Sequence, residues 1–232
     1  MENNTIIQID NLVKRYPVGG GHFTALEDIN LKIDTGEFTG LVGPSGSGKT
    51  TMLNIVGSLD NPSDGDARVI NTSISNISAR RASVLRKKHI GFIFQTYNLM
   101  PVYTVYENVE FPLLLLHMTG AERKKAVLDA LEWVGLTSKI KSRPKQLSGG
   151  ESQRVAIARA MVKKPEMVLA DEPTANLDAE NSHHILKTMV NLNKELKTTF
   201  LFATHDDKVI QYLRRIIRLE DGRIVSDETV KK

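Results

Sequence analysis

The sequence predicts an α/β fold, because short apolar runs typical of buried strands alternate with helix-like segments. One run, residues 38–42, leads through a glycine-rich loop into a helix-like segment that begins at Thr51. Two more, residues 167–170 and 199–203, each end in polar or charged side chains. Parallel strands covered by helices read as continuous apolar runs and carry ligands at their carboxyl ends, so these runs predict one such sheet.

Antiparallel strands are expected before and after this sheet. Residues 6–9 and 29–33 have strand patterns, and the glycine-rich segment 17–21 between them is typical of a hairpin. Residues 216–225 predict a closing hairpin across Asp221-Gly222. Residues 97–150 are expected to be mainly helical. Their clearest helix covers residues 122–134, with one apolar stripe and Gly135 at a C-cap position.

The glycine-rich loop fits the G-x-x-x-x-G-K-[ST] pattern of a nucleoside triphosphate site. Its residues, with the next one in the helix, are Gly43, Pro44, Ser45, Gly46, Ser47, Gly48, Lys49, Thr50 and Thr51. Glycines let the backbone wrap around an anion, so that N–H groups and the helix N-terminus point at phosphates. Lys49 adds positive charge near the β- and γ-phosphates, and the Thr50 hydroxyl is placed to ligate Mg²⁺. A flexible surface loop is the alternative, which the flanking strand and helix disfavour.

A second anion-binding element lies at residues 147–151, Leu-Ser-Gly-Gly-Glu. Ser148 supplies a hydroxyl, and Gly149 and Gly150 open a helix whose free N–H groups and positive dipole end favour an anion. This pentapeptide closely resembles the signature sequence of ABC ATPases, and the chain resembles the nucleotide-binding domain of an ABC transporter from about Ile6 to about Val225. Glu151 stands where many relatives have Gln, a variant that leaves the signature's anion contacts in place.

The resemblance implies a P-loop NTPase of the ABC-ATPase fold: a RecA-like core, an N-terminal antiparallel β subdomain and a helical subdomain with the signature. Residues 1–232 are then one domain, in which residues 1–96 and 151–232 form the β subdomain and the core, and residues 97–150 the helical subdomain. In the family, two domains pair head to tail, and each signature closes on the triphosphate held by the other. The expected partner is a second copy of the chain, in an ATP-dependent homodimer.

Two carboxylates after the apolar run 167–170 match acidic residues of the family. Asp171 corresponds to the Walker B aspartate, which holds Mg²⁺, and Glu172 to the residue that orients and polarises the attacking water. His205 follows the run 199–203 and matches the switch histidine that the family places against the γ-phosphate. Glu172, His205 and Lys49 are therefore the candidate catalytic residues, and Asp171 is a candidate metal ligand.

Three further residues are assigned to the nucleotide site by the resemblance. Gln95 corresponds to the Q-loop glutamine, which reaches Mg²⁺ and the reactive water, and Tyr16 to the aromatic residue that stacks on adenine. Asp178 fits the D-loop, where it either aligns the two-domain sandwich or caps the helix that follows. His183 and His184 are expected to face solvent, since the chain has no cysteine to complete a soft metal site.

The segment 98–109 resembles the group that contains lipoprotein-release, macrolide-export and cell-division ATPases. Its apolar residues Leu99, Met100 and Val109 either form a groove for the coupling helix of a membrane permease or pack the helical subdomain. The permease is the second expected partner. The segment favours export or extraction of a lipoprotein, a peptide or a hydrophobic drug.

Composition narrows the location and the partners. The 232 residues are 41% hydrophobic, which supports a real core, and no apolar run approaches the roughly 20 residues of a membrane helix. The polar start, Met1 to Asn4, does not look like a secretion leader. With ATP chemistry and no cysteine, the expected location is cytoplasmic and peripheral, on the inner face of the cell membrane through the permease.

The net charge of +4, from 31 Lys and Arg against 27 Asp and Glu, permits an anionic partner without requiring one. The basic clusters at residues 80–88 and 123–125 have no interleaved aromatic residues, so nucleic-acid binding is not expected. Solvated helix faces explain the clusters most simply, with a surface near anionic lipid headgroups as the sharper alternative.

The sequence therefore predicts an ATPase that binds ATP and Mg²⁺, closes as a dimer and drives a membrane permease. The alternative is an ABC-type clamp without transport, which signals across the membrane in cell division or acts on a soluble partner. The cargo is beyond prediction, because in this architecture it touches the membrane subunits.

Overall fold

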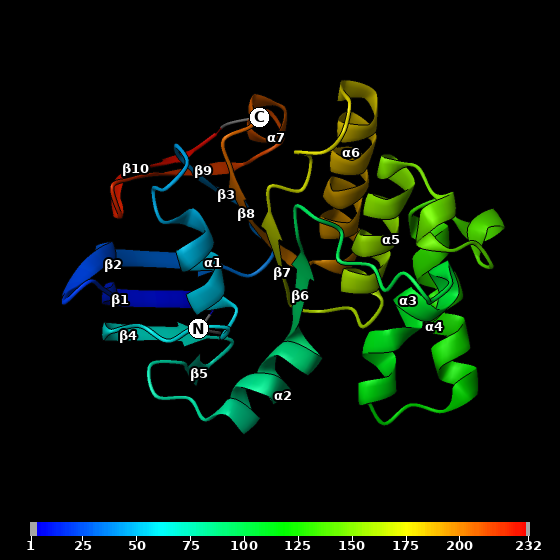
Figure 1. Ribbon diagram of the computed structural model, residues 1–232, viewed down its shortest axis with the longest axis horizontal. Coiled ribbons are helices and arrows are strands. Elements are labelled where there is room, and N and C mark those ends of the chain that lie inside the picture. Colours follow the sequence, from blue (N-terminus) through cyan, green and yellow to red (C-terminus); the bar gives the residue numbers. More distant parts are fainter. Residues whose placement is uncertain (1–3, 231–232) are drawn as a thin grey trace.

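The computed structural model describes residues 4–230, which form two sheets and a group of helices (Figure 1). One sheet is antiparallel and has four strands in the order β2-β1-β4-β5. The other has six strands in the order β10-β9-β3-β8-β7-β6, all parallel except β10. The expectation about the polar start concerns Met1 to Asn4, of which residues 1–3 lie outside the described residues.

The strand bounds match the predicted runs closely in the parallel sheet and extend beyond them in the antiparallel one. They are β1 Thr5–Val18, β2 Gly21–Asp34, β3 Phe38–Val42, β4 Asp64–Val69, β5 Thr72–Ser73, β6 Ile90–Ile93, β7 Met167–Asp171, β8 Thr199–Thr204, β9 Arg215–Glu220 and β10 Arg223–Thr229. The long hairpin of β1 and β2 turns at Gly19 and Gly20, both with positive φ. The predicted closing hairpin joins β9 and β10 across Asp221 and Gly222.

The helices alternate with the strands of the parallel sheet, as the α/β prediction requires. They are α1 Lys49–Val56, α2 Ala79–His89, α3 Val105–Glu110, α4 Gly120–Trp133, α5 Gly149–Met161, α6 Ala179–Leu196 and α7 Asp207–Ile210, with 3₁₀ turns η1 Phe111–Leu115, η2 Thr137–Lys139 and η3 Pro144–Gln146. In Figure 1, α3 to α6 lie on one side of the parallel strands and α1 on the other, facing β1 and β2.

Two hydrophobic cores divide at the parallel sheet. Strand β3 has Phe38 and Val42 in the core beneath the helices α3 to α6, whereas Leu41 packs with α1 and the antiparallel sheet. Both faces of the strand are therefore buried, which is why it reads as a continuous apolar run.

The helical segment differs from prediction in its details. Helix α4 begins two residues early because Thr119 and Glu122 form a capping box, and Gly135 with φ +67 follows its C-cap. Val109 is fully buried in the core, so it packs the helical segment and does not line a partner groove. The expectation of a solvated face at residues 123–125 fails at Arg123, whose half-buried side chain pairs with Glu110 at 3.0 Å.

Candidate nucleotide-hydrolysing site

The phosphate loop joins the end of β3 to the start of α1, and its shape depends on glycine. Gly46 and Gly48 have φ of +82 and +101, a region that residues with a Cβ rarely adopt. A Cβ on Gly48 would lie 2.7 Å from the carbonyl oxygen of Ala25, and one on Gly43 would collide with the carbonyl of Leu219. The loop therefore brings its backbone closer to its surroundings than any other residue type would permit.

Lys49 and Thr50 lie at the first turn of α1. The Nζ atom of Lys49 donates to the carbonyl oxygens of Gly43 and Pro44, both at 2.7 Å, so the ammonium group sits within the curve of the loop. Burial lowers the pKa of Lys49, while the carboxylates of Glu172 and Asp171 act in the opposite direction. The positive charge and the two negative charges therefore share one site.

Asp171, the last residue of β7, faces Thr50. The Thr50 hydroxyl lies 3.1 Å from Oδ2 and 3.3 Å from Oδ1 of Asp171. Burial is the main cause of the raised pKa of Asp171, and the hydrogen bond from Thr50 opposes it. Residues 121 positions apart in the sequence thus meet at the carboxyl edge of the sheet, as the strand pattern predicts.

Glu172 is held from two directions. His205 Nδ1 lies 2.6 Å from Oε1 of Glu172, and the Thr204 hydroxyl donates to Oε2 at 3.0 Å. The backbone of Glu172 has φ +44 and donates its N–H to the carbonyl of Ala203. The Glu172 side chain is 14% exposed and that of His205 62%, so the carboxylate is sheltered while the imidazole reaches solvent.

The signature residues form the N-terminus of α5. Ser148 is the N-cap, and its hydroxyl accepts from the N–H of Glu151 at 3.2 Å, while the Glu151 carboxylate accepts from the N–H of Ser148 at 2.8 Å. Gly149 and Gly150 are the first helical residues. The bond to the Ser148 N–H lowers the pKa of Glu151, and Lys139 adds to this effect from 3.1 Å.

The signature helix and the phosphate-loop helix do not meet within one chain. Figure 1 shows α1 and α5 separated by the strands β6, β7 and β8. The hydrogen bonds of the Ser148 side chain, among the described residues, remain within the first turn of α5. The two anion-binding elements are therefore apart.

The predicted D-loop and Q-loop residues have mixed outcomes. Asp178 is the N-cap of α6 and accepts from the N–H of Asn181 at 2.8 Å, which is one of its two predicted roles. The carbonyl oxygen of Gln95 accepts from the Asn176 side chain at 2.8 Å. The side chain of Gln95 is exposed and makes no hydrogen bond to the residues described, so the structure does not bring it into contact with Asp171 or Thr50.

Tyr16 lies near the phosphate loop, on the far end of β1. Its hydroxyl donates to Asp60 Oδ2 at 2.8 Å, and Lys14 Nζ donates to Asp60 Oδ1 at 2.6 Å while lying 4.8 Å from the centre of the Tyr16 ring. Burial and the bond to Asp60 raise the pKa of Tyr16, whereas Thr51 of α1 lowers it. The ring is therefore fixed beside the helix that follows the phosphate loop.

Sequence analysis missed three residues that shape the site. Thr204 holds Glu172, Asp60 holds Tyr16, and Gln153 of α5 donates to the carbonyl of Pro173 at 2.6 Å, just after Glu172. A hydroxyl at a strand end next to His205 is a signal that could have indicated Thr204. No local signal indicates Asp60 or Gln153, because their partners are distant in sequence.

One prediction outside the site is wrong. His183 does not face solvent freely: it is half buried, and its Nδ1 lies 2.9 Å from the hydroxyl of Tyr212. Its neighbour His184 is exposed, as predicted. The difference arises because α6 packs against α7 and turns one of two adjacent side chains inward.

Comparison with known protein families shows which family the chain belongs to. The family model described as "ABC transporter" matches residues 26–175, which include the phosphate loop, the signature and both acidic residues. The chain belongs to the ABC transporter family. Its prediction as an ABC ATPase, with the fold that this implies, is confirmed.

Individual ABC proteins resemble the chain over nearly its whole length. An uncharacterized ABC transporter ATP-binding protein of Methanocaldococcus jannaschii, MJ0796, is 41% identical over 97% of this chain and 98% of its own. The lipoprotein-releasing system ATP-binding protein LolD of Pseudoalteromonas translucida is 41% identical and is covered to 98% on both sides. The macrolide export ATP-binding/permease protein MacB of Burkholderia thailandensis is 42% identical over 96% of this chain, which spans only 34% of that relative.

A solved ABC cassette has the same fold. The structure described as a dimeric post-hydrolysis state of MJ0796 bound to ADP and Pi superimposes with a TM-score of 0.89 at 40% identity, covering 97% of this chain and 99% of the other. Among residues 4–230, no helix has the length and apolar character that a membrane span requires.

Proposed function

We propose that the chain is the ATP-hydrolysing subunit of a membrane transporter and that two copies close head to tail around two ATP molecules. One observation carries this proposal: Lys49, Thr50, Asp171, Glu172 and His205 gather at one sheet edge, whereas α5, the helix that Ser148 caps, lies on the other side of the parallel strands from α1. A single chain then holds half of each of two sites.

The phosphate loop fits the triphosphate. Ser47 has a buried hydroxyl oxygen without a partner among the described residues, and the positive φ of Gly46 and Gly48 turns successive N–H groups toward the same space. Lys49 would exchange its bonds to two loop carbonyls for phosphate oxygens. Tyr16, held by Asp60, provides a ring beside α1 on which adenine can stack.

The donor set also fits Mg²⁺. The Thr50 hydroxyl and the Asp171 carboxylate offer neighbouring oxygen atoms, and oxygen ligands are those that Mg²⁺ prefers. Among the described residues no group of three or more His, Cys, Asp and Glu forms a metal cage, so further ligands would be phosphate oxygens and water, as is usual for this ion. When bound, Mg²⁺ would neutralise charge on the β- and γ-phosphates. We keep Gln95 as a candidate ligand, because its bond to Asn176 uses the backbone carbonyl and leaves the side-chain amide without a hydrogen bond to the described residues.

Glu172 would act on the attacking water. Its carboxylate accepts a hydrogen bond from the water, whose oxygen attacks the γ-phosphorus as the bond to the leaving oxygen of ADP breaks. Thr204 orients the carboxylate through its hydrogen bond to Oε2. The side chain of His205 is 62% exposed, so its Nε2 can face the γ-phosphate. The products are ADP and inorganic phosphate.

The partner's signature would complete the site. The N–H groups of Gly149 and Gly150 and the Ser148 hydroxyl, at the positive end of α5, suit the γ-phosphate held by the other copy. Glu151 shapes this turn through its bond to the Ser148 N–H, and Asp178 fixes the start of α6 on the same side. The dimeric MJ0796 structure, described as bound to ADP and Pi, is consistent with this arrangement.

We further propose that the chain binds a membrane permease, which would place it on the inner face of the cell membrane. The relatives LolD and MacB are described as lipoprotein-releasing and macrolide-export proteins, which favours extraction or export. Residues 1–232 would form one domain, with residues 97–150 as its helical subdomain and the remainder as β subdomain and core.

Phosphate release at increasing protein concentration tests the shared site. If each site needs two copies, the turnover per subunit rises with concentration until dimers dominate. Turnover that stays constant down to nanomolar protein would show that one copy suffices and would contradict the proposal.

A further inference from the structure

Helix α2 carries a positive charge that the nucleotide site does not use. Its 11 residues contain five Lys and Arg and one His, and no Asp or Glu. The helix leads directly into β6, and Figure 1 shows it at the end of this strand opposite to the arrowhead. The nucleotide site lies at the carboxyl edge of the sheet, so the charge of α2 lies at the other edge.

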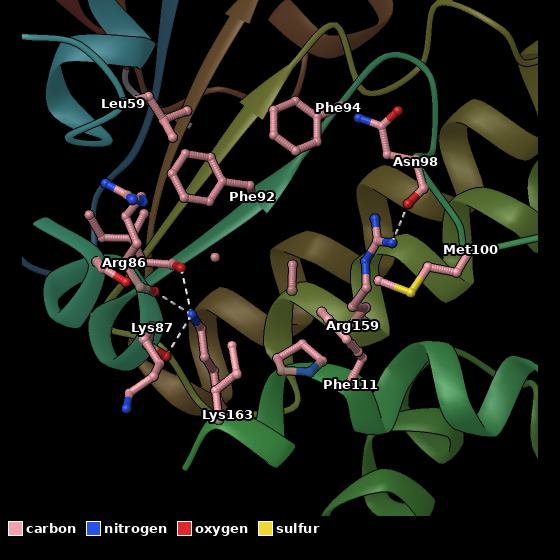
Figure 2. A pocket seen from close by; sticks show the side chains of 16 residues that line it. Leu59, Arg86, Lys87, Phe92, Phe94, Asn98, Met100, Phe111, Arg159 and Lys163 are labelled. Carbon is pink, nitrogen blue, oxygen red and sulfur yellow. Dashed lines mark hydrogen bonds between the residues drawn. The ribbon is translucent and has the colours of Figure 1, made fainter. Parts of the chain in front are cut away.

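One side of α2 is fixed to the rest of the chain. The Nζ atom of Lys163 donates to three carbonyl oxygens at the end of the helix, those of Arg86, Lys87 and Ile90, through the bonds drawn in Figure 2. Arg86 in turn donates to the carbonyl oxygen of Ser58. A helix leaves its last carbonyl groups without partners, and Lys163 supplies the missing donor. The helix therefore has a firm attachment on this side.

The other side of α2 is a basic face made of Arg80, Arg81, Val84 and Lys88, which are all exposed. Arg80, Val84 and Lys88 follow one another at four-residue spacing, and Arg81 comes three residues before Val84. Side chains three and four residues apart are neighbours on a helix surface. Val84, with 42% of its surface exposed, therefore lies among three cations.

The cations of the basic face have no partners among residues 4–230. The side chains of Arg80, Arg81 and Lys88 form no hydrogen bond or ion pair with these residues. Within the same part of the chain, the one carboxylate that pairs with α2 is Glu166, which lies 2.6 Å from Nδ1 of His89 at the end of the helix. The three positive charges therefore remain available to a partner.

A groove of about 460 Å³ runs beside the basic face. Arg80, Arg81 and Val84 line it together with Thr72 and Ser78, and its lining contains no carboxylate. Guanidinium groups bind phosphate through pairs of N–H donors, and hydroxyl groups donate to phosphate oxygens as well. The groove therefore has the donors that a phosphate group requires.

We propose that the basic face binds the anionic headgroups of the membrane that contains the permease. This rests on the proposed function and adds a second, direct attachment to the lipid surface. A headgroup phosphate pairs with Arg80 and Arg81, and Lys88 adds attraction to the same surface. Val84 contacts the apolar region next to the headgroups, as apolar side chains of interfacial helices do.

A membrane fits the basic face better than other anionic partners do. Nucleic acid would be bound by aromatic side chains that stack on bases, and α2 has none. An acidic protein must match the spacing of the three cations with carboxylates of its own. Lipid headgroups move within the membrane surface, so they can meet an exposed helix face at any spacing.

Co-sedimentation with vesicles measures this binding. We expect the parent protein to bind vesicles of phosphatidylglycerol and phosphatidylcholine at low salt and to bind phosphatidylcholine alone much less. Each Lys or Arg near an anionic surface contributes about a fivefold factor. The double variant Arg81→Gln, Lys88→Gln should therefore bind the anionic vesicles about 25-fold more weakly.

A second double variant provides the matched control. Lys187→Gln, Lys194→Gln also removes two positive charges, from exposed positions on α6, which Figure 1 shows apart from α2. Its affinity for the vesicles should fall less than about twofold. Thermal melting of both variants verifies the fold.

A fluorescent probe reports contact at the basic face itself. The one tryptophan of the chain, Trp133, is replaced in a Trp133→Phe background, and Val84→Trp is added. Emission from position 84 should shift to shorter wavelength with anionic vesicles and stay unchanged with phosphatidylcholine vesicles, because the indole enters the headgroup region only in the first case.

Three outcomes would overturn the proposal: equal losses in the two double variants, no binding of the parent to anionic vesicles, or no change in emission from position 84. A single-stranded oligonucleotide and polyglutamate serve as separate probes. If either binds through Arg81 and Lys88 while vesicles do not, the partner is not lipid and the proposal is wrong. ATP hydrolysis by the same preparations is measured in parallel, so a failure of the proposed function is seen independently of vesicle binding.

Discussion

The Nδ1 atom of His205 lies 2.6 Å from Oε1 of Glu172, and the second oxygen of the same carboxylate is occupied by the Thr204 hydroxyl. The residue that would polarise water and the one that would contact the γ-phosphate therefore share a bond. Because Nδ1 of His205 is bound to Glu172, Nε2 is the ring nitrogen that remains to face a γ-phosphate.

Thr204 acts on the reaction through Glu172. The Thr204→Val variant has the same shape but leaves Oε2 of Glu172 without its donor, so kcat should fall by about tenfold with little change in KM. Thr204→Ser keeps the hydroxyl and should retain most of the rate. Steady-state kinetics of both variants checks this, and equal rates for Val and Ser would contradict a positioning role.

Tyr16 should contribute to ATP affinity through its ring. Tyr16→Ala is expected to raise KM for ATP about tenfold or more, in line with about 1–3 kcal/mol for stacking on a base, while Tyr16→Phe keeps the ring and changes KM much less. Asp60→Asn weakens the support of the ring and should lie between them. Titration with a fluorescent ATP analogue measures the series. If Ala and Phe bind alike, stacking is not the role of Tyr16.

Glu151 should stabilise the first turn of α5 mainly as a hydrogen-bond acceptor for the Ser148 N–H, and less through its negative charge. Glu151→Gln keeps an acceptor for the Ser148 N–H, so unfolding free energy should change by less than about 0.5 kcal/mol, whereas Glu151→Ala removes the capping bond and should cost about 1 kcal/mol. Urea unfolding of the two variants provides the comparison. A Gln variant as unstable as the Ala variant would show that the ion pair with Lys139 dominates.

Lys163 should make stability depend on pH in the alkaline range. Its pKa is about 8 in the folded protein and its ordinary value is 10.5, so between these values the unfolded chain binds more protons and stability rises with pH. Lys163→Met lacks this dependence. The melting temperature of the parent minus that of the variant should therefore increase from pH 8 to about pH 10. If this difference stays constant or decreases over the range, burial does not destabilise the charged form of Lys163 in the folded protein.

The sequence predicted what local patterns determine. The apolar runs give β3, β7 and β8 almost to the residue, and Asp171, Glu172 and His205 lie together because parallel strands end at one edge of a sheet. The glycine-rich loop is predictable because Gly46 and Gly48 adopt positive φ values, which glycine allows more readily than other residues. These features depend on residues close in sequence or on a general rule of sheet geometry.

Other features follow only from tertiary packing. Lys163 follows the last turn of α5, and its Nζ atom reaches the end of α2, more than 70 positions earlier in the sequence. The pair of Tyr16 and Asp60 depends on how β1 lies against the segment after α1. The burial of Val109 depends on the contact of α3 with α5, and no periodicity within six helical residues could establish it.

Light scattering of the Glu172→Gln variant with ATP and Mg²⁺ tests the shared nucleotide site most directly. The variant retains the phosphate loop and the signature but should hydrolyse ATP about 10²–10⁴-fold more slowly, so the closed state accumulates. We expect a dimer with ATP, a monomer with ADP, and a monomer in either case when Ser148→Arg is added. A variant that binds ATP, turns it over at the parent rate and remains monomeric would contradict both the role of Glu172 and the shared site.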